Sequence, residues 1–251
     1  HMSQQQRQRD IWNQPQIMKK DFLMIPLYIL FQMVVPIIVV FGTLGLTAMI
    51  TQKPPAQFLY NLSLSIGFVL AQFLVLFIFF AMHKFDIAQV MKRQLHYARN
   101  KTLHILLTII GVVIVMCLLR WLFNMFGIGP TQYERRVEGL FHYPSALCFT
   151  MISMVILRPM VEVIIYKHLI IHELSKKWPT AVTIILSIMI ETMVHVYDMM
   201  SVWEMLPFLI MAIGSTLIYI ISGMNLAAAY LYQSGIQGVL FIIMVFKMLI
   251  M

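Results

Sequence analysis

Charged residues are scarce in this chain. Lys, Arg, Asp and Glu make up 11% of its 251 residues, whereas hydrophobic residues make up 61%. A soluble domain needs about a quarter of its residues charged to cover its surface, so this composition excludes one. Apolar runs of about twenty residues are typical of membrane-spanning helices, and they lack the alternation of barrel strands. The composition therefore predicts an all-α polytopic membrane protein.

Cysteines and acidic residues are also few. Cys117 and Cys148 both lie in apolar runs, which favours a packing role over a disulfide or a metal pair. Eighteen basic residues against ten acidic ones give a net charge of +8. Because the basic residues lie in short segments between apolar runs, the positive-inside rule explains them. Nucleic-acid binding is not expected.

The apolar runs predict seven transmembrane helices, or eight if the fourth or the last run is broken in two. The expected spans are 22–50, 58–82, 103–126, 144–171, 180–197, 205–221 and 226–251. Residues 1–21 are interpreted as a polar cytoplasmic arm, in which His1 and Met2 look like a tag remnant. Residues 22–251 then form a single transmembrane domain. No signal peptide is evident.

The distribution of Lys and Arg predicts the orientation. With the N-terminus inside, eleven of them lie in cytoplasmic segments and three in the opposite loops. We therefore expect a multi-pass protein of the cell membrane with a cytoplasmic N-terminus. The basic segment 83–102 has apolar residues at helical spacing, which predicts an amphipathic helix on the membrane surface. A solvated basic loop is the alternative.

Polar side chains interrupt three of the apolar runs. They are Glu162 and Lys167, Glu191 and His195, and Gln233 and Gln237. At a helical rise of ~1.5 Å per residue, Glu162, His195 and the two glutamines lie roughly 13 to 22 Å in from turns on the predicted cytoplasmic side. An acid inside a membrane is a functional-site hypothesis by default. The similar depths predict one shared intramembrane polar cavity.

Spacing alone leaves the role of this cavity open. A carboxylate and an imidazole that face one cavity can activate a water molecule, and amides can donate to an oxyanion. Polar groups at helical spacing also hold transmembrane helices together. A proton or ion path through Glu162, Glu191 and His195 is a third reading, although no inverted repeat is visible.

The segment around Glu162 has a motif-like spacing. Pro159 precedes Glu162 by three residues, Val163 follows it, and Tyr166 and Lys167 complete the segment. This resembles the first motif of the CAAX-protease and bacteriocin-processing (CPBP or Abi) family, which has two adjacent glutamates, three residues and an arginine. Glu162 matches the first glutamate. Val163 stands in place of the second glutamate, and Lys167 in place of the arginine.

Two later segments fit the same family in order and spacing. The family's second motif is a phenylalanine, three residues and a histidine, and here Glu191 replaces the phenylalanine while His195 is kept. The last motif is a histidine, three residues and asparagine or aspartate after a turn that Asn225 and its neighbours resemble. Gln233 and Gln237 occupy its two polar positions. The CPBP-like core covers about residues 144–240.

The resemblance implies an intramembrane endopeptidase in which Glu162 activates water with help from His195. It implies that Gln233 and Gln237 lie where the oxyanion is held or, in the metalloprotease description, where a metal is bound. Amides donate hydrogen bonds but are not ordinary metal ligands. No cofactor is therefore predicted, because one imidazole and one or two carboxylates fall short of a typical zinc site.

Four of the six polar motif positions are replaced, which favours a second hypothesis. The chain would then be a catalytically inactive membrane scaffold on the same fold, and it would bind a peptide or a membrane protein. An engineered variant of an active parent is also compatible with these changes. Lys167 has lost the acid expected at Val163, so we expect Glu162 or Glu191 to be its partner. Membrane lipid is the other expected partner.

Overall fold

The computed structural model describes residues 12, 14–84, 86–196 and 202–250. Within this part the regular structure is helical, and no strand occurs. The α-helices are α2 (Met24–Thr51), α3 (Gln57–Met82), α4 (Ile87–Ala98), α5 (Thr102–Met125), α6 (Gln132–Gly139), α7 (Leu147–Met151), α8 (Arg158–Val163), α9 (Thr180–Met193), α10 (Met205–Ile221) and α11 (Leu226–Ile250). Two π-helical segments, η5 (Ile152–Leu157) and η6 (Ile164–Glu173), flank α8.

Six helical runs are long and apolar enough to cross a membrane. They are Lys19–Thr51, Gln57–Met82, Ile87–Met125, Pro144–Lys176, Val202–Ile221 and Leu226–Ile250. The prediction of a helical, multi-pass membrane protein is confirmed at this level. Helix α9 has 14 residues and is only about 21 Å long, which is shorter than a bilayer core of about 30 Å. The last run is one unbroken helix, α11.

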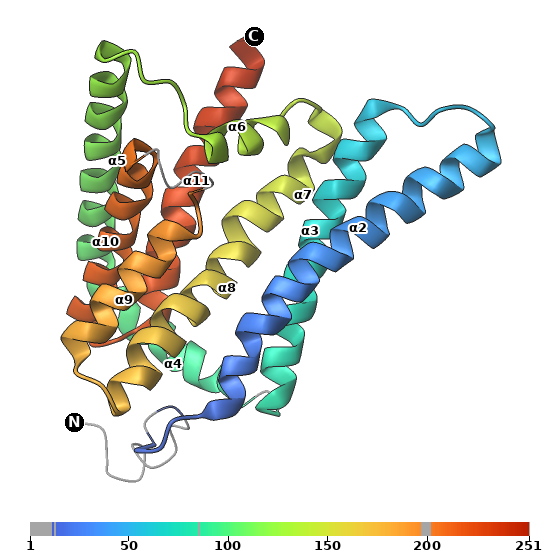
Figure 1. Ribbon diagram of the computed structural model, residues 1–251. Coiled ribbons are helices and arrows are strands. Elements are labelled where there is room, and N and C mark those ends of the chain that lie inside the picture. The colour runs from blue at the N-terminus through green and yellow to red at the C-terminus, as the bar shows by residue number, and fades with distance from the viewer. Residues whose placement is uncertain (1–11, 13, 85, 197–201, 251) are drawn as a thin grey trace.

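The run from Pro144 to Lys176 is central to the molecule. Helices α2 and α3 pair as a hairpin on one side of it, and α5, α9, α10 and α11 gather on the other (Figure 1). Helix α8 itself packs against both α3 and α11. The segment that carries Glu162 is therefore surrounded by helices from both ends of the sequence.

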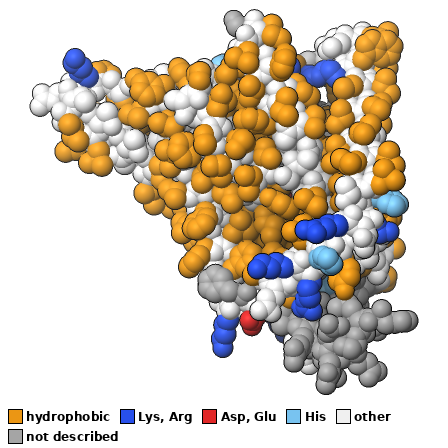
Figure 2. Space-filling model, turned by 180° about the vertical axis from the view of Figure 1, so that it is seen from behind, with side chains coloured by type: hydrophobic (Ala, Val, Ile, Leu, Met, Phe, Trp, Pro, Cys, Tyr) orange, Lys and Arg blue, Asp and Glu red, His pale blue; other side chains and the backbone are white. Residues whose placement is uncertain are grey.

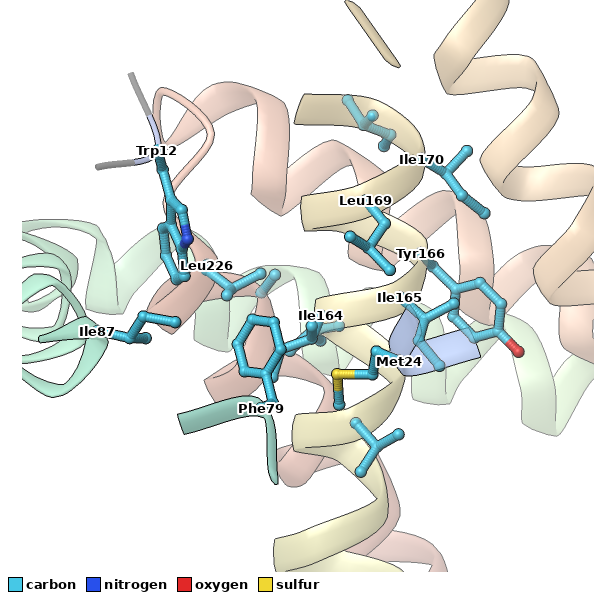
Figure 3. Packing of buried hydrophobic residues seen from close by; sticks show 14 of the residues in the cluster. Trp12, Met24, Phe79, Ile87, Ile164, Ile165, Tyr166, Leu169, Ile170 and Leu226 are labelled. Atoms are coloured by element: carbon cyan, nitrogen blue, oxygen red, sulfur yellow. The ribbon is translucent and has the colours of Figure 1, made fainter. Parts of the chain in front are cut away.

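The largest apolar cluster surrounds η6. Ile164 and Leu169 of η6 are fully buried, and Met24, Phe79 and Leu226 reach them from α2, α3 and α11 (Figure 3). A continuous row of buried residues from 161 to 171 follows from these contacts on all sides. This burial fixes the rotation of the run and hence the direction of its polar side chains.

The outer surface is largely apolar. Figure 2 shows hydrophobic side chains over most of one face, with most of the Lys, Arg and His side chains toward its lower end and a few at its upper edge. Residues such as Phe41, Trp121 and Phe126 are exposed. Exposed aromatic and aliphatic side chains on this scale suit lipid rather than water.

Two segments differ from their sequence-based interpretation. The segment between the expected spans 103–126 and 144–171 is not a simple loop: it contains α6, whose N-cap Thr131 accepts a hydrogen bond from the backbone N–H of Glu134 at 3.1 Å. In the predicted arm, Trp12 and Asp21 are buried. The helix expected in segment 83–102 is present as α4. The tag remnant and most of the loop expected at 198–204 lie outside the described residues.

The hairpin of α2 and α3 depends on a glycine at its contact. A Cβ at Gly67 would lie 2.7 Å from the Cα of Pro36, so Gly67→Ala forces the two backbones apart. Overpacking of this kind costs about 1–3 kcal/mol. We expect a lower thermal unfolding midpoint for Gly67→Ala in detergent. Gly42→Ala is the matched control, since nothing lies within 4 Å of its position; equal midpoints for the two variants would contradict the proposed close contact.

Candidate functional site

Glu162 of α8 is the centre of a buried polar group. Its Oε2 accepts a hydrogen bond from Nε2 of Gln233 at 3.1 Å. Its Oε1 lies 3.9 Å from Nε2 of His195 and 4.0 Å from Nε of Arg158. Only 7% of Glu162 is exposed. The structure thus brings together residues from α8, α11 and the turn after α9.

The ring of His195 has a defined orientation. Its Nδ1 lies 2.7 Å from the backbone carbonyl oxygen of Glu191, and a carbonyl oxygen only accepts, so Nδ1 donates this bond. In the neutral ring Nε2 is then the acceptor, and it is the atom that faces Glu162. Phe208 stacks on the ring at 4.9 Å, and Tyr133 meets it edge-on at 5.0 Å.

Lys167 does not pair with Glu162. Its Nζ donates to Oε2 of Glu191 at 3.0 Å and to Oγ1 of Thr216 at 3.1 Å, and 1% of the residue is exposed. Of the two partners expected from the sequence, Glu191 is therefore the one that Lys167 binds. The carboxylate of Glu162 is left available to His195 and Gln233.

Val163 lies among apolar residues. It belongs to the cluster around η6 and is 2% exposed. A glutamate at this position would enter that apolar cluster. The acid that pairs with Lys167 comes instead from position 191 of α9.

A cavity of about 370 Å³ lies beside this polar group. Its lining includes Glu191, His195, Gln233 and Gln237, together with residues of α5, α6 and α10. Glu162 is not part of the lining and meets it through Gln233 and His195. Gln237 is half-buried and faces the cavity one helical turn beyond Gln233.

Helix α6 adds residues that sequence reasoning missed. Tyr133 lines the cavity and contacts His195. Arg120 of α5 bonds to Glu134 at 2.5 Å, and the backbone N–H of Gln132 donates to Glu204 at 3.1 Å. These contacts tie α6 to α5 and to the start of α10. The capping signal of Thr131 followed by Glu134 was present in the sequence and marks the start of this helix.

The residues around Glu162 do not make a good metal site. They offer one imidazole, one carboxylate and an amide, whereas zinc sites in proteins typically have three or four N, S or carboxylate ligands. The Nδ1 atom of His195 is already engaged by a carbonyl.

A second polar cluster lies further along the same run. His168, His172 and Glu173 of η6 approach one another, and Asp21 contacts both His168 and His83. The spacing of two histidines four residues apart was a usable sequence signal. The sequence near His168 did not indicate that Asp21 and His83 join this cluster, since both residues are far from His168 in the chain.

Comparison with protein-family models, with curated proteins and with solved structures finds no match to this chain. The resemblance to the CPBP family therefore rests on the motif residues alone.

The pair of Lys167 and Glu191 gives a stability prediction. Removal of one partner leaves a buried charge without compensation, which costs about 3–5 kcal/mol. We expect Lys167→Met and Glu191→Gln each to lower the thermal unfolding midpoint in detergent, and the double variant to recover most of the loss. Lys247→Met is the control, because Lys247 pairs with Glu138 at 3.9 Å on an exposed surface. Additive losses in the double variant would contradict the pairing.

Proposed function

We propose that this chain is a CPBP-type intramembrane endopeptidase that uses glutamate-activated water to cleave a membrane-associated peptide or protein. One observation carries the proposal: the carboxylate of Glu162 faces the acceptor nitrogen of His195 at 3.9 Å. A separation of this length between two acceptors suits a bridging water molecule, which donates one hydrogen to each.

The residues support a balanced hydrolysis. The water oxygen attacks the scissile carbonyl carbon while Glu162 takes its proton, and a tetrahedral oxyanion forms. As the C–N bond breaks, Glu162 passes the proton to the leaving nitrogen. Gln233 has a second N–H besides the one that it donates to Glu162, and Gln237 faces the same cavity. These amides are the proposed donors to the oxyanion.

The size of the cavity and its location bear on the substrate. A volume of about 370 Å³ suits a short peptide segment with its side chains. We place this cavity within the bilayer, with α9 as a short seventh span beside it. We place the protein in the cell membrane with the N-terminus in the cytoplasm. The proposed partners are membrane lipid and a peptide or membrane-protein substrate.

A scaffold without catalytic activity is the second candidate. Val163 lies in an apolar cluster, and amides at positions 233 and 237 cannot take up a proton. On this reading the cavity holds a peptide or a partner helix, and Glu162 and His195 serve as hydrogen-bonding groups. The two candidates share one site and differ in whether a peptide bond is broken there.

Cleavage in liposomes tests the proposal. The protein is reconstituted and incubated with prenylated and with leader-bearing peptides, and the products are identified by mass spectrometry. We expect the wild-type protein to cleave one class. Glu162→Gln removes the group that takes up the proton, and His195→Asn removes the ring nitrogen that positions the water, so each lowers the rate about 10²- to 10⁴-fold.

Asp86→Asn serves as the control, because Asp86 is exposed and lies outside the cavity. It is expected to cleave at the wild-type rate. Activity that survives Glu162→Gln would contradict the assignment of the base. Binding of a peptide without cleavage by the wild-type protein would favour the scaffold.

A further inference from the structure

The second polar cluster lies where the described N-terminal segment meets η6. His168, His172 and Glu173 each offer a ligand atom, and these atoms lie within 4.8 Å of one another. His168 and Glu173 are 1% and 0% exposed. Polar groups are costly to bury and persist where they have partners, and none of these groups belongs to the site at Glu162.

The ligand set matches zinc chemistry. Two imidazoles and one carboxylate, with a fourth position open, form a common set of zinc ligands. The Nδ1 atom of His172 lies 3.2 Å from Oε1 of Glu173. Ligand atoms of tetrahedral zinc are separated by about 3.3 Å, given zinc–nitrogen distances of about 2.0–2.1 Å. The His168 and His172 rings are near-parallel, at 21°, with centroids 5.7 Å apart.

Asp21 supplies a second, independent observation. Its Oδ2 lies 3.0 Å from Nε2 of His168, and its Oδ1 contacts Nε2 of His83. Asp21 is fully buried. A carboxylate bound to one nitrogen of a histidine orients the ring and presents the other nitrogen to a metal. The Nδ1 atom of His168 is the one that this arrangement leaves for a ligand.

The ammonium group of Lys176 binds the carboxylate of Glu173, where a metal ion would otherwise bind. Its Nζ lies 3.0 Å and 2.8 Å from the two carboxylate oxygens. The backbone N–H of Met18 donates to the same carboxylate at 3.1 Å. Lys176 lies at the end of its helical run and is partly exposed, so its ammonium group can move to solvent when a metal ion arrives.

A path to the cluster is present. A cavity of about 330 Å³ is lined by His168 and His172 and also by Trp12, Arg93 and Tyr97. Trp12 lies at one edge of the packed cluster shown in Figure 3, and its ring centroid is 4.3 Å from that of His168. The two histidines are therefore reachable from this cavity although they are largely buried.

We propose that His168, His172 and Glu173 bind a divalent metal ion such as Zn²⁺. Asp21 orients His168, and Lys176 occupies the carboxylate when the metal is absent. The ion fastens the segment that contains Met18 and Asp21 onto η6. This site is distinct from the one at Glu162 and His195, and it does not depend on the proposed hydrolysis.

Zinc binding by the full-length protein in detergent tests the proposal. The protein is stripped with a chelator, dialysed and titrated with Zn²⁺ against a fluorescent competitor. We expect one tightly bound ion and a higher thermal unfolding midpoint with zinc. His172→Ala and Glu173→Gln remove a ligand and should abolish both effects. Asp21→Asn should weaken binding about 10- to 100-fold, as loss of an outer partner does.

Two further variants separate the proposal from misfolding and from the other site. Lys176→Gln removes the competing ammonium group, so it should tighten zinc binding, a gain that misfolding cannot produce. His195→Ala should keep the bound ion, as should His104→Ala on the exposed face of α5. An absence of zinc binding by the wild-type protein, or loss of zinc in His195→Ala but not in His172→Ala, would overturn the proposal.

Discussion

A buried ammonium group imposes the main constraint on this structure. Lys167 lies in the most deeply buried helical run and must be compensated, because an isolated charge there costs several kcal/mol. Glu191 and Thr216 provide that compensation from α9 and α10. The backbone carbonyl of the same Glu191 orients His195. One residue therefore neutralises Lys167 and directs the imidazole toward Glu162, so that the geometry around Glu162 depends on the position of α9.

Much of this arrangement follows from the sequence. The long apolar runs define the spans, since their length and composition are what a bilayer requires. The similar depths of Glu162, His195 and Gln233 were sufficient to predict that they meet. The partner of Lys167 was not predictable, because Glu162 and Glu191 are both within reach of a long flexible side chain. That choice depends on how each helix is rotated, and rotation is set by packing on all sides.

Other features have little local signal. The π-helical segments on both sides of α8 have wider turns than an α-helix, and no single residue type specifies them. The contact between Asp21 and His168 joins residues 147 positions apart. It requires the segment just before α2 to lie against η6. Helix α6 is short, and its position depends on the contact between its Glu134 and Arg120 of α5, which are 14 residues apart.

The geometry of the central run accounts for the partners of its polar side chains. Lys167 and His168 are neighbours, yet Lys167 binds Glu191 and Thr216, whereas His168 binds Asp21. Val163 enters the apolar cluster, where a carboxylate would be costly. An acid at position 191 of α9 supplies the charge that position 163 lacks. Val163 and Glu191 therefore suit the packing and the charge of this run together, and Glu162 and His195 face each other beside them.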